Sequence, residues 1–249
     1  MLLENKNAVV YGAGGSMGGA AARALASEGA RVFLVGRTLA KLEAVASDIA
    51  SAGRAADVAQ VDVHDREAVE EHADSVISAA GTLDISFNAV GMDAVQNQPT
   101  IDMSLDDFMT PIVEAARSHF NTCTAAARRM AGQGSGVIVT LSTTAAREWR
   151  HEMGGFNVAC AGIEAFSRSL AHQVGRSGVR VICIRPNFTP ETQPGEIPVG
   201  TLDPLIQDTA IGRLPRLAEV SRTVVLAASD HAGAMTGAVL NLSCGAIID

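Results

Sequence analysis

Aromatic side chains are scarce in this chain of 249 residues. They make up 4% of it, with one tryptophan and one tyrosine, Tyr11. Glycine and alanine are abundant instead, which favours close packing of helices on a sheet over a core of large rings. Because the single tyrosine lies at position 11, no tyrosine elsewhere in the chain is available as an acid or a base.

Cysteine is also sparse, with four residues and no C-x-x-C pair. This pattern excludes a disulfide framework and gives no reason to expect a zinc site or any other metal site. A cytoplasmic protein with reduced thiols is therefore the expectation.

Positive charge is in deficit, since the formal net charge is −8 at pH 7. Nucleic acids and anionic membranes need a cationic surface, so neither is an expected partner. Glycine, arginine or aspartate interrupts every apolar run before it reaches membrane-spanning length. The opening segment MLLENKNAVVYG enters a strand almost at once and does not read as a signal peptide.

Short β-rich runs alternate with longer amphipathic ones along the whole chain. The expected strands are Ala8–Tyr11, Arg31–Val35, Ala59–Val63, Ile85–Phe87, Gly136–Leu141, Val179–Ile184 and Val239–Leu242. The expected helices span about residues 17–28, 39–52, 66–80, 105–130, 155–175 and 217–228. Continuous apolar strands alternating with helices predict an α/β fold, a Rossmann-type doubly wound parallel sheet of about seven strands flanked by helices. We find no linker, so residues 1–249 are expected to form a single domain.

One long irregular segment interrupts this alternation. It is rich in proline between Pro186 and Pro204 and continues to about residue 216. Long irregular segments of compact domains are commonly functional, so residues 186–216 are interpreted as a substrate loop. The alternative is a surface excursion without a role.

A glycine-rich turn joins the first strand to the first helix, with the sequence Tyr11-Gly-Ala-Gly-Gly-Ser-Met-Gly-Gly19. Glycines there let the backbone approach a pyrophosphate, and the following helix N-terminus offers free N–H groups and a partial positive charge. The turn thus predicts a dinucleotide site.

This turn resembles the T-G-x-x-x-G-x-G loop of the short-chain dehydrogenases/reductases, with Tyr11 at the Thr and Ser16 at the middle Gly. Four further segments resemble motifs of this family, in the order in which the family has them. Asp62-Val63 resembles its adenine-contacting pair and residues 88–91 its N-N-A-G motif. Arg185-Pro186 resembles the start of its R-P-G motif, and Thr236-Gly237 resembles part of its C-terminal motif. The resemblance covers essentially the whole chain and implies a nicotinamide cofactor. The cofactor-binding positions that it implies are Gly12, Gly14, Gly15, Ser16, Met17, Gly18, Arg37, Thr38, Asp62, Val63, Asn88, Ala89, Gly91 and Pro186.

The second strand is followed by Gly36-Arg37-Thr38, where NAD-type sites commonly carry an acid that binds the ribose 2′-hydroxyl. An arginine can hold a 2′-phosphate through charge-assisted hydrogen bonds. NADP(H) is therefore favoured over NAD(H). The alternative is that Arg37 is a solvated residue that opens the loop.

The resemblance also implies a catalytic set, and this chain lacks most of it. The family reduces a carbonyl with a hydride from the nicotinamide and a proton from a Tyr, which a Lys activates. Phe156 falls at that Tyr, Cys160 at the Lys and Ala115 at the helical Asn. Thr143 falls at the Ser that orients the substrate, or Ser142 if the register slips by one. Phe156 cannot exchange a proton and Cys160 cannot supply a fixed cation.

Other groups near these positions are candidates for moving a proton. His151, in the loop before Phe156, titrates near neutrality, and Glu148 or Glu152 would do so if desolvated. His119 lies one turn after Ala115, on the same helix face. Each of the four could equally be a solvated or packed residue. Trp149 could wall a substrate pocket or simply pack.

Three functions remain open from the sequence. The first is an NAD(P)(H)-binding oxidoreductase with an atypical site, acting on an unknown small molecule. An already activated substrate, such as an iminium or a polarised enone, would need the tyrosine least. The second is a non-redox cyclase, isomerase or dehydratase, and the third is a dinucleotide-binding protein without catalysis. By resemblance, helices 105–130 and 155–175 are expected to form the interface of a homodimer or homotetramer.

Overall fold

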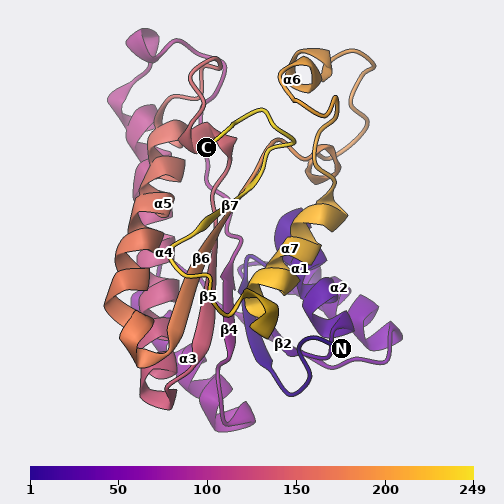
Figure 1. Ribbon diagram of the computed structural model, residues 1–249, viewed down its shortest axis with the longest axis vertical. Helices are drawn as coiled ribbons and strands as arrows, with labels where there is room; N and C mark the ends of the chain where they lie inside the picture. Colours follow the sequence, from indigo (N-terminus) through magenta and orange to yellow (C-terminus); the bar gives the residue numbers. More distant parts are fainter.

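Seven parallel strands form one continuous sheet in the order β3-β2-β1-β4-β5-β6-β7. The computed structural model describes residues 1–249 (Figure 1). The strands are β1 (Asn7–Tyr11), β2 (Arg31–Gly36), β3 (Ala56–Gln60), β4 (Ile85–Asn88), β5 (Gly136–Leu141), β6 (Val179–Pro186) and β7 (Val239–Leu242). The predicted doubly wound α/β fold in a single domain is confirmed.

Helices cover both faces of this sheet, which is why its strands read as continuous apolar runs. The helices are α1 (Ser16–Ser27), α2 (Leu39–Ser51), α3 (Arg66–Ala80), α4 (Leu105–Gln133), α5 (Gly155–Val174), α6 (Asp203–Gln207) and α7 (Leu217–Ala228). Helices α1, α2 and α7 lie on one face and α3, α4 and α5 on the other (Figure 1). Each face encloses its own buried cluster, one around Leu34 and Phe87 and the other around Tyr11 and Ile138.

The strand order reverses between β1 and β4, which are neighbours in the sheet although β2 and β3 intervene in the chain. Crevices outside the carboxyl ends of strands at such a reversal are where doubly wound sheets bind ligands. The segment 187–216 follows β6 at this end and carries the short helix α6, which stands above the sheet in Figure 1.

Helices α4 and α5 pack side by side, and their close approach fixes the position of residue 156. The Ser104 hydroxyl caps α4 by accepting the Asp107 N–H at 3.1 Å. A Cβ added at Gly155, the first residue of α5, would collide with the backbone carbonyl of Phe108. Glycine at 155 therefore brings the start of α5, with Phe156, against α4. No helix of the protein is both long enough and apolar enough to cross a membrane.

Two predictions about the elements were wrong. The third strand covers Ala56–Gln60, not Ala59–Val63. The Val61 N–H still reaches the Gly36 carbonyl at 3.1 Å, but the chain then leaves this edge strand. The apolar residues Val61 and Val63 lie after the strand ends, but they continue its apolar pattern. The pattern therefore placed the strand too far along the chain. The α6 helix was not predicted, because five residues containing a proline give no helical period.

Candidate active site

The turn between β1 and α1 is built for close approach of another group to the backbone. Gly12 has φ +76°, a conformation that side chains with a Cβ disfavour. A Cβ on Gly18 would strike the Gly12 carbonyl, so helix α1 can begin this near the turn only with glycine at 18. No side chain caps the N-terminus of α1 and its first turn contains no acid. Its N–H groups are therefore free to receive an anion such as a pyrophosphate.

A cleft of about 280 Å³ adjoins this turn. It is lined by Gly12, Gly15, Gly36, Arg37, Val61, Val63, Ala89, Val90, Gly91, Met92 and Asp93. Six of these are positions that the resemblance implied for the cofactor. Arg37 is exposed at the rim, and its side chain makes no hydrogen bond within the protein. Thr38 is the N-cap residue of α2, again without a side-chain cap bond. This donor set fits the adenosine end of a dinucleotide, including a phosphate on its ribose.

Asp62 and Asn88 are also implied by the resemblance. They do not line the cleft, but their side chains hydrogen-bond to the backbone beside it. The Asp62 carboxylate accepts the His64 N–H at 3.0 Å. The Asn88 amide donates to the Thr122 hydroxyl at 2.8 Å, and its carbonyl oxygen accepts the Val90 N–H at 3.0 Å. Asn88 thus holds the 89–91 turn against Gly12.

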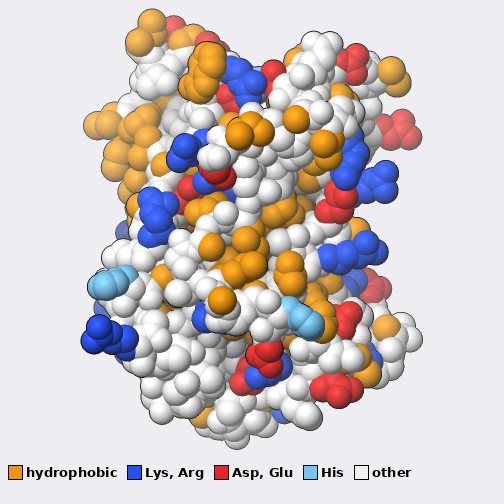
Figure 2. Space-filling model, viewed as in Figure 1, with side chains coloured by type: hydrophobic (Ala, Val, Ile, Leu, Met, Phe, Trp, Pro, Cys, Tyr) orange, Lys and Arg blue, Asp and Glu red, His pale blue; other side chains and the backbone are white.

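A larger cavity of about 460 Å³ shares residues 89–92 with this cleft, so the two adjoin. Its walls come from residues after β4, β5 and β6 and from segment 187–208. Among the residues implied for the site, Met17, Ala89, Gly91, Thr143, His151, Phe156 and Pro186 line it. Figure 2 shows the surface hollowed at the top, beside the lobe that carries α6. A long cofactor spanning both cavities would present one end here.

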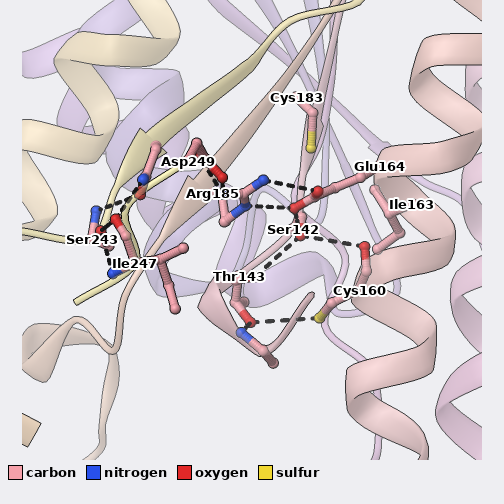
Figure 3. Close-up of polar contacts among 12 residues, drawn as sticks. Ser142, Thr143, Cys160, Ile163, Glu164, Cys183, Arg185, Ser243, Ile247 and Asp249 are labelled. Carbon is pink, nitrogen blue, oxygen red and sulfur yellow. Dashed lines mark hydrogen bonds and ion pairs between the residues drawn. The ribbon is translucent and has the colours of Figure 1, made fainter. Parts of the chain in front are cut away.

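Thr143 lines this cavity, and Cys160 lies buried behind it, with the two side chains facing each other (Figure 3). The Thr143 hydroxyl oxygen lies 3.5 Å from Cys160 Sγ and accepts the Ala145 N–H at 3.1 Å. Burial raises the pKa of the Cys160 thiol to about 11. Cys160 is therefore a neutral thiol at physiological pH, with no cation beside it.

Ser142, the alternative in a shifted register, belongs to a buried ion-pair network (Figure 3). Its hydroxyl donates to Glu164 at 3.0 Å, and Glu164 accepts from Arg185 at 2.7 and 3.0 Å. Asp249 accepts from the same guanidinium at 2.7 and 2.8 Å. Burial alone would lower the pKa of Arg185, but these hydrogen bonds outweigh it and raise the pKa. Ser142 is thus tied into the structure, which leaves Thr143 as the less constrained hydroxyl.

Ala115 and His119 do not form a proton relay to the cavity. Ala115 packs with Ala159, Ile163 and Cys183 and does not line the cavity. The His119 ring is buried, with Nδ1 3.0 Å from the Ala115 carbonyl and Nε2 without a partner. Burial lowers the pKa of His119 to about 4, so the ring is neutral. The expectation that His119 serves the site finds no support in this geometry.

A charged group closes the cavity on the side of the 147–154 loop. Arg150 donates to Glu148 at 2.9 Å and lies 3.0 Å from Asp208, just after α6. His151 Nε2 lies 3.7 Å from Asp208. Hydrogen bonding from Arg150, opposed by partial burial, lowers the pKa of Glu148 to about 2. Glu148 is therefore a fixed carboxylate and not a proton donor, contrary to the expectation for a desolvated acid.

Two other residues of this loop are away from the cavity. Trp149 is 84% exposed and neither walls the pocket nor packs in the core. Glu152 is exposed and does not line the cavity. No group of three or more His, Cys, Asp or Glu side chains is placed to hold a metal ion.

Several residues of the site could not be found from the sequence. Arg150 and Asp208 are far apart in the chain and carry no shared motif, and Glu164 reads as an ordinary charge on a helix. Asn187 directly follows Arg185-Pro186, at the position of the Gly in the R-P-G motif. Its side-chain carbonyl accepts from the Thr144 hydroxyl at 3.1 Å and from the Phe188 N–H at 2.7 Å, joining two walls of the cavity.

Comparison with known proteins extends these observations over the whole chain. Residues 12–246 match the family model described as enoyl-(acyl carrier protein) reductase. The 3-oxoacyl-[acyl-carrier-protein] reductase of Chlamydia trachomatis is 27% identical over 245 residues, which cover 98% of each chain.

Solved structures share the same architecture. NAD⁺-bound xylitol dehydrogenase superposes with a TM-score of 0.89 at 24% identity, covering 97% of this chain and 99% of that one. A gluconate 5-dehydrogenase from Burkholderia cenocepacia, in complex with NADP and tartrate, has a TM-score of 0.89 at 23% identity, covering 98% and 96%. The first of these structures contains NAD⁺ and the second NADP.

Proposed function

The chain belongs to the short-chain dehydrogenase/reductase family of oxidoreductases, and from this premise we propose that it transfers hydride between NADP(H) and a small molecule without the family's tyrosine–lysine pair. The observation that carries the proposal is the pair of adjoining cavities. One has the glycine turn and the exposed Arg37, and the other is lined by Thr143 and Phe156, with the Cys160 thiol buried behind Thr143.

The residues of the smaller cleft fit a dinucleotide. The free N–H groups of α1 suit a pyrophosphate, and Arg37 with the N-terminus of α2 suits a 2′-phosphate. This supports NADP(H) over NAD(H). When bound, the cofactor would supply or accept the hydride, which no side chain of the chain can do.

The protein's own residues then shape the second cavity and handle its polar groups. Thr143 offers a hydroxyl that can donate to a polar substrate atom. Phe156 gives an apolar wall where the family has its proton donor, and Cys160 stays protonated. Any proton that the reaction needs must come from His151, from water or from the substrate itself. We propose His151 for this role because it is the only histidine that lines the cavity, and an imidazole can both donate and accept a proton.

The two alternative functions gain nothing from the relatives described above, which are named as reductases or dehydrogenases. A cyclase, isomerase or dehydratase would also need positioned acids and bases, and the cavity is poor in them. A protein that only binds the dinucleotide has no need for the second cavity.

We further propose a homodimer or homotetramer in the cytoplasm. Exposed apolar residues recur along one side of α4, at Leu105, Met109 and Val113, and Val158 is exposed on α5. Figure 2 shows hydrophobic side chains gathered at the upper left edge, where the beginnings of α4 and α5 lie. All four cysteines are unpaired, which supports a reducing compartment.

Stopped-flow measurement of NADPH oxidation against a panel of ketones, enones and iminium ions tests this function. We expect oxidation with at least one class, at a rate above that without protein. Product formation without a change in nicotinamide absorbance would instead assign a non-redox reaction.

A further inference from the structure

We propose that the substrate is a cation, an iminium ion whose C=N⁺ carbon receives the hydride. This inference rests on the proposed function and narrows it to one class of substrate. It draws on the charges around the larger cavity, on the two replaced catalytic residues and on the balance of the reaction.

Two arginines, one in the cavity wall and one behind it, each lie between two carboxylates. Arg150 is bound by Glu148 and by Asp208, at 2.9 and 3.0 Å. Behind the opposite wall, Arg185 is bound by Glu164 and Asp249, both at 2.7 Å (Figure 3). Neither guanidinium is left to receive an anionic substrate, because each is already bound by two carboxylates.

The charged residues that line the cavity also have a net negative charge. Two carboxylates, of Glu148 and Asp208, face one guanidinium, of Arg150, which gives a formal charge of −1 when His151 is not counted. Glu148 stays ionised at any physiological pH, because Arg150 holds its pKa near 2. A cavity with this balance favours a cationic ligand over a neutral or anionic one.

A cationic substrate explains both catalytic replacements at once. The family's lysine at position 160 would place an ammonium group just behind Thr143 and disfavour a cation in the cavity, whereas the Cys160 thiol there is neutral. The family's tyrosine protonates the carbonyl oxygen, which becomes negatively charged as the hydride arrives. An iminium nitrogen instead goes from a positive charge to neutral and needs no proton. Phe156 and Phe188 line the cavity as aromatic rings, whose faces attract cations.

The balance of the reaction requires no proton. The iminium carbon gains a hydride and forms a C–H bond. The π pair of C=N⁺ becomes a lone pair on nitrogen, and the cation becomes a neutral amine. The reduced dinucleotide is the hydride source and is itself oxidised. A ketone or an enone would become an alkoxide or enolate instead, beside Thr143 alone and within a negatively charged cavity.

A matched pair of probes tests this. The permanent cation 2-methyl-3,4-dihydroisoquinolinium and the neutral ketone 1-tetralone have similar ring systems. With NADPH deuterated at C4, we expect the protein to transfer deuterium to C1 of the iminium at a rate ~10²-fold or more above any reduction of tetralone. The reaction without protein gives the background.

Binding gives a readout that does not depend on turnover. In calorimetry on protein saturated with 1,4,5,6-tetrahydro-NADP, which cannot donate hydride, we expect the iminium to bind roughly tenfold more tightly than tetralone. Asp208→Asn should remove most of this difference, because it removes a negative charge from the wall. Cys160→Lys should also remove it, whereas the neutral Cys160→Met should retain it.

The outcomes separate the inference from the function on which it rests. Equal binding of both probes, or faster reduction of tetralone, overturns the cationic substrate while leaving an oxidoreductase. Failure to bind either NADPH or tetrahydro-NADP overturns the proposed function itself, and the inference with it.

Discussion

At the scale of single residues, we propose that positions 156 and 160 decide the chemistry. By the family resemblance, a phenylalanine and a buried neutral thiol are expected where the family places its acid and its cation. Thr143 keeps a hydroxyl at the same wall, 3.5 Å from that thiol. The single tyrosine of the chain, Tyr11, is buried in the core on β1 and its pKa is raised by burial, so it cannot replace the missing acid.

Restoring the family's residues should create carbonyl reduction. We expect Phe156→Tyr combined with Cys160→Lys to raise ketone reduction with NADPH by ~10²-fold or more, the usual contribution of a positioned acid. Phe156→Tyr with Cys160→Met should gain much less, because nothing then lowers the tyrosine pKa. A double variant that binds NADPH yet remains inert toward ketones would show that these positions do not face the substrate.

Arg37 should determine the choice of cofactor. Arg37→Asp replaces a group that binds a 2′-phosphate with one that repels it. NADPH affinity should then fall on the order of 10–100-fold, while NADH affinity is kept or improved. Arg54→Asp is a control, since Arg54 precedes β3 at the opposite end of the sheet. Calorimetric affinities that are equal for both variants would assign the phosphate to other residues.

At the scale of elements, the glycine turn and the start of α1 form one unit. The structure requires Gly18 only because α1 begins against the Gly12 carbonyl. Gly18→Ala should therefore displace the turn and weaken dinucleotide binding by more than tenfold, about the effect of losing one charge-assisted hydrogen bond. Gly132→Ala on α4, where an added Cβ meets nothing within 4 Å, should leave binding unchanged. If both variants bind the dinucleotide equally well, the turn does not hold the pyrophosphate.

Helix α4 contributes a buried histidine that should make stability depend on pH. Burial lowers the folded-state pKa of His119 to about 4, below the unfolded value of about 6.5. The unfolded chain therefore binds more protons, so stability is complete above pH 6.5 and is lost as pH falls toward 4.

Between pH 7 and pH 5 this single group should cost about 2 kcal/mol of unfolding free energy. Urea unfolding of wild type and His119→Leu at both pH values measures the cost. Between these pH values His119→Leu should lose about 2 kcal/mol less unfolding free energy than the wild type. His72, whose pKa burial also lowers to about 4, is present in both proteins and cancels. An equal loss in both would mean that His119 is protonated in the folded state.

The sequence predicted most elements because each strand here is a short apolar run covered on both faces. It misplaced β3, where Val61 and Val63 serve the cleft rather than the sheet. It also pointed to residues that line the two cavities, such as Gly12 and Arg37 at the smaller and Thr143 and Phe156 at the larger, because these lie in or beside local motifs; their roles stay predictions. It missed the Arg150–Asp208 and Glu164–Arg185 ion pairs, because each joins segments that only the tertiary fold brings together.

At the scale of the whole molecule, exposed apolar side chains recur along the α4–α5 face. Leu105, Met109, Val113 and Phe120 are exposed along α4, with Val158 beside them on α5. Exposed apolar patches on this scale commonly mark an interface between proteins.

Placing charge on this face should dissociate the assembly. We expect light scattering to find a dimer or tetramer for the wild type and monomers for Val113→Glu combined with Val158→Glu. Val199→Glu, fully exposed near α6, is the matched control and should keep the assembly. A wild-type monomer would mean that this face has another use.

We propose that the protein has the phosphate-binding half of the family's site but lacks the family's acid and cation in the catalytic half. Calorimetric titration of the purified protein with NADPH and with NADH tests this most directly. We expect NADPH to bind with one site per chain and more tightly than NADH. Absence of heat with both dinucleotides, at protein concentrations where the fold is intact, would contradict the account.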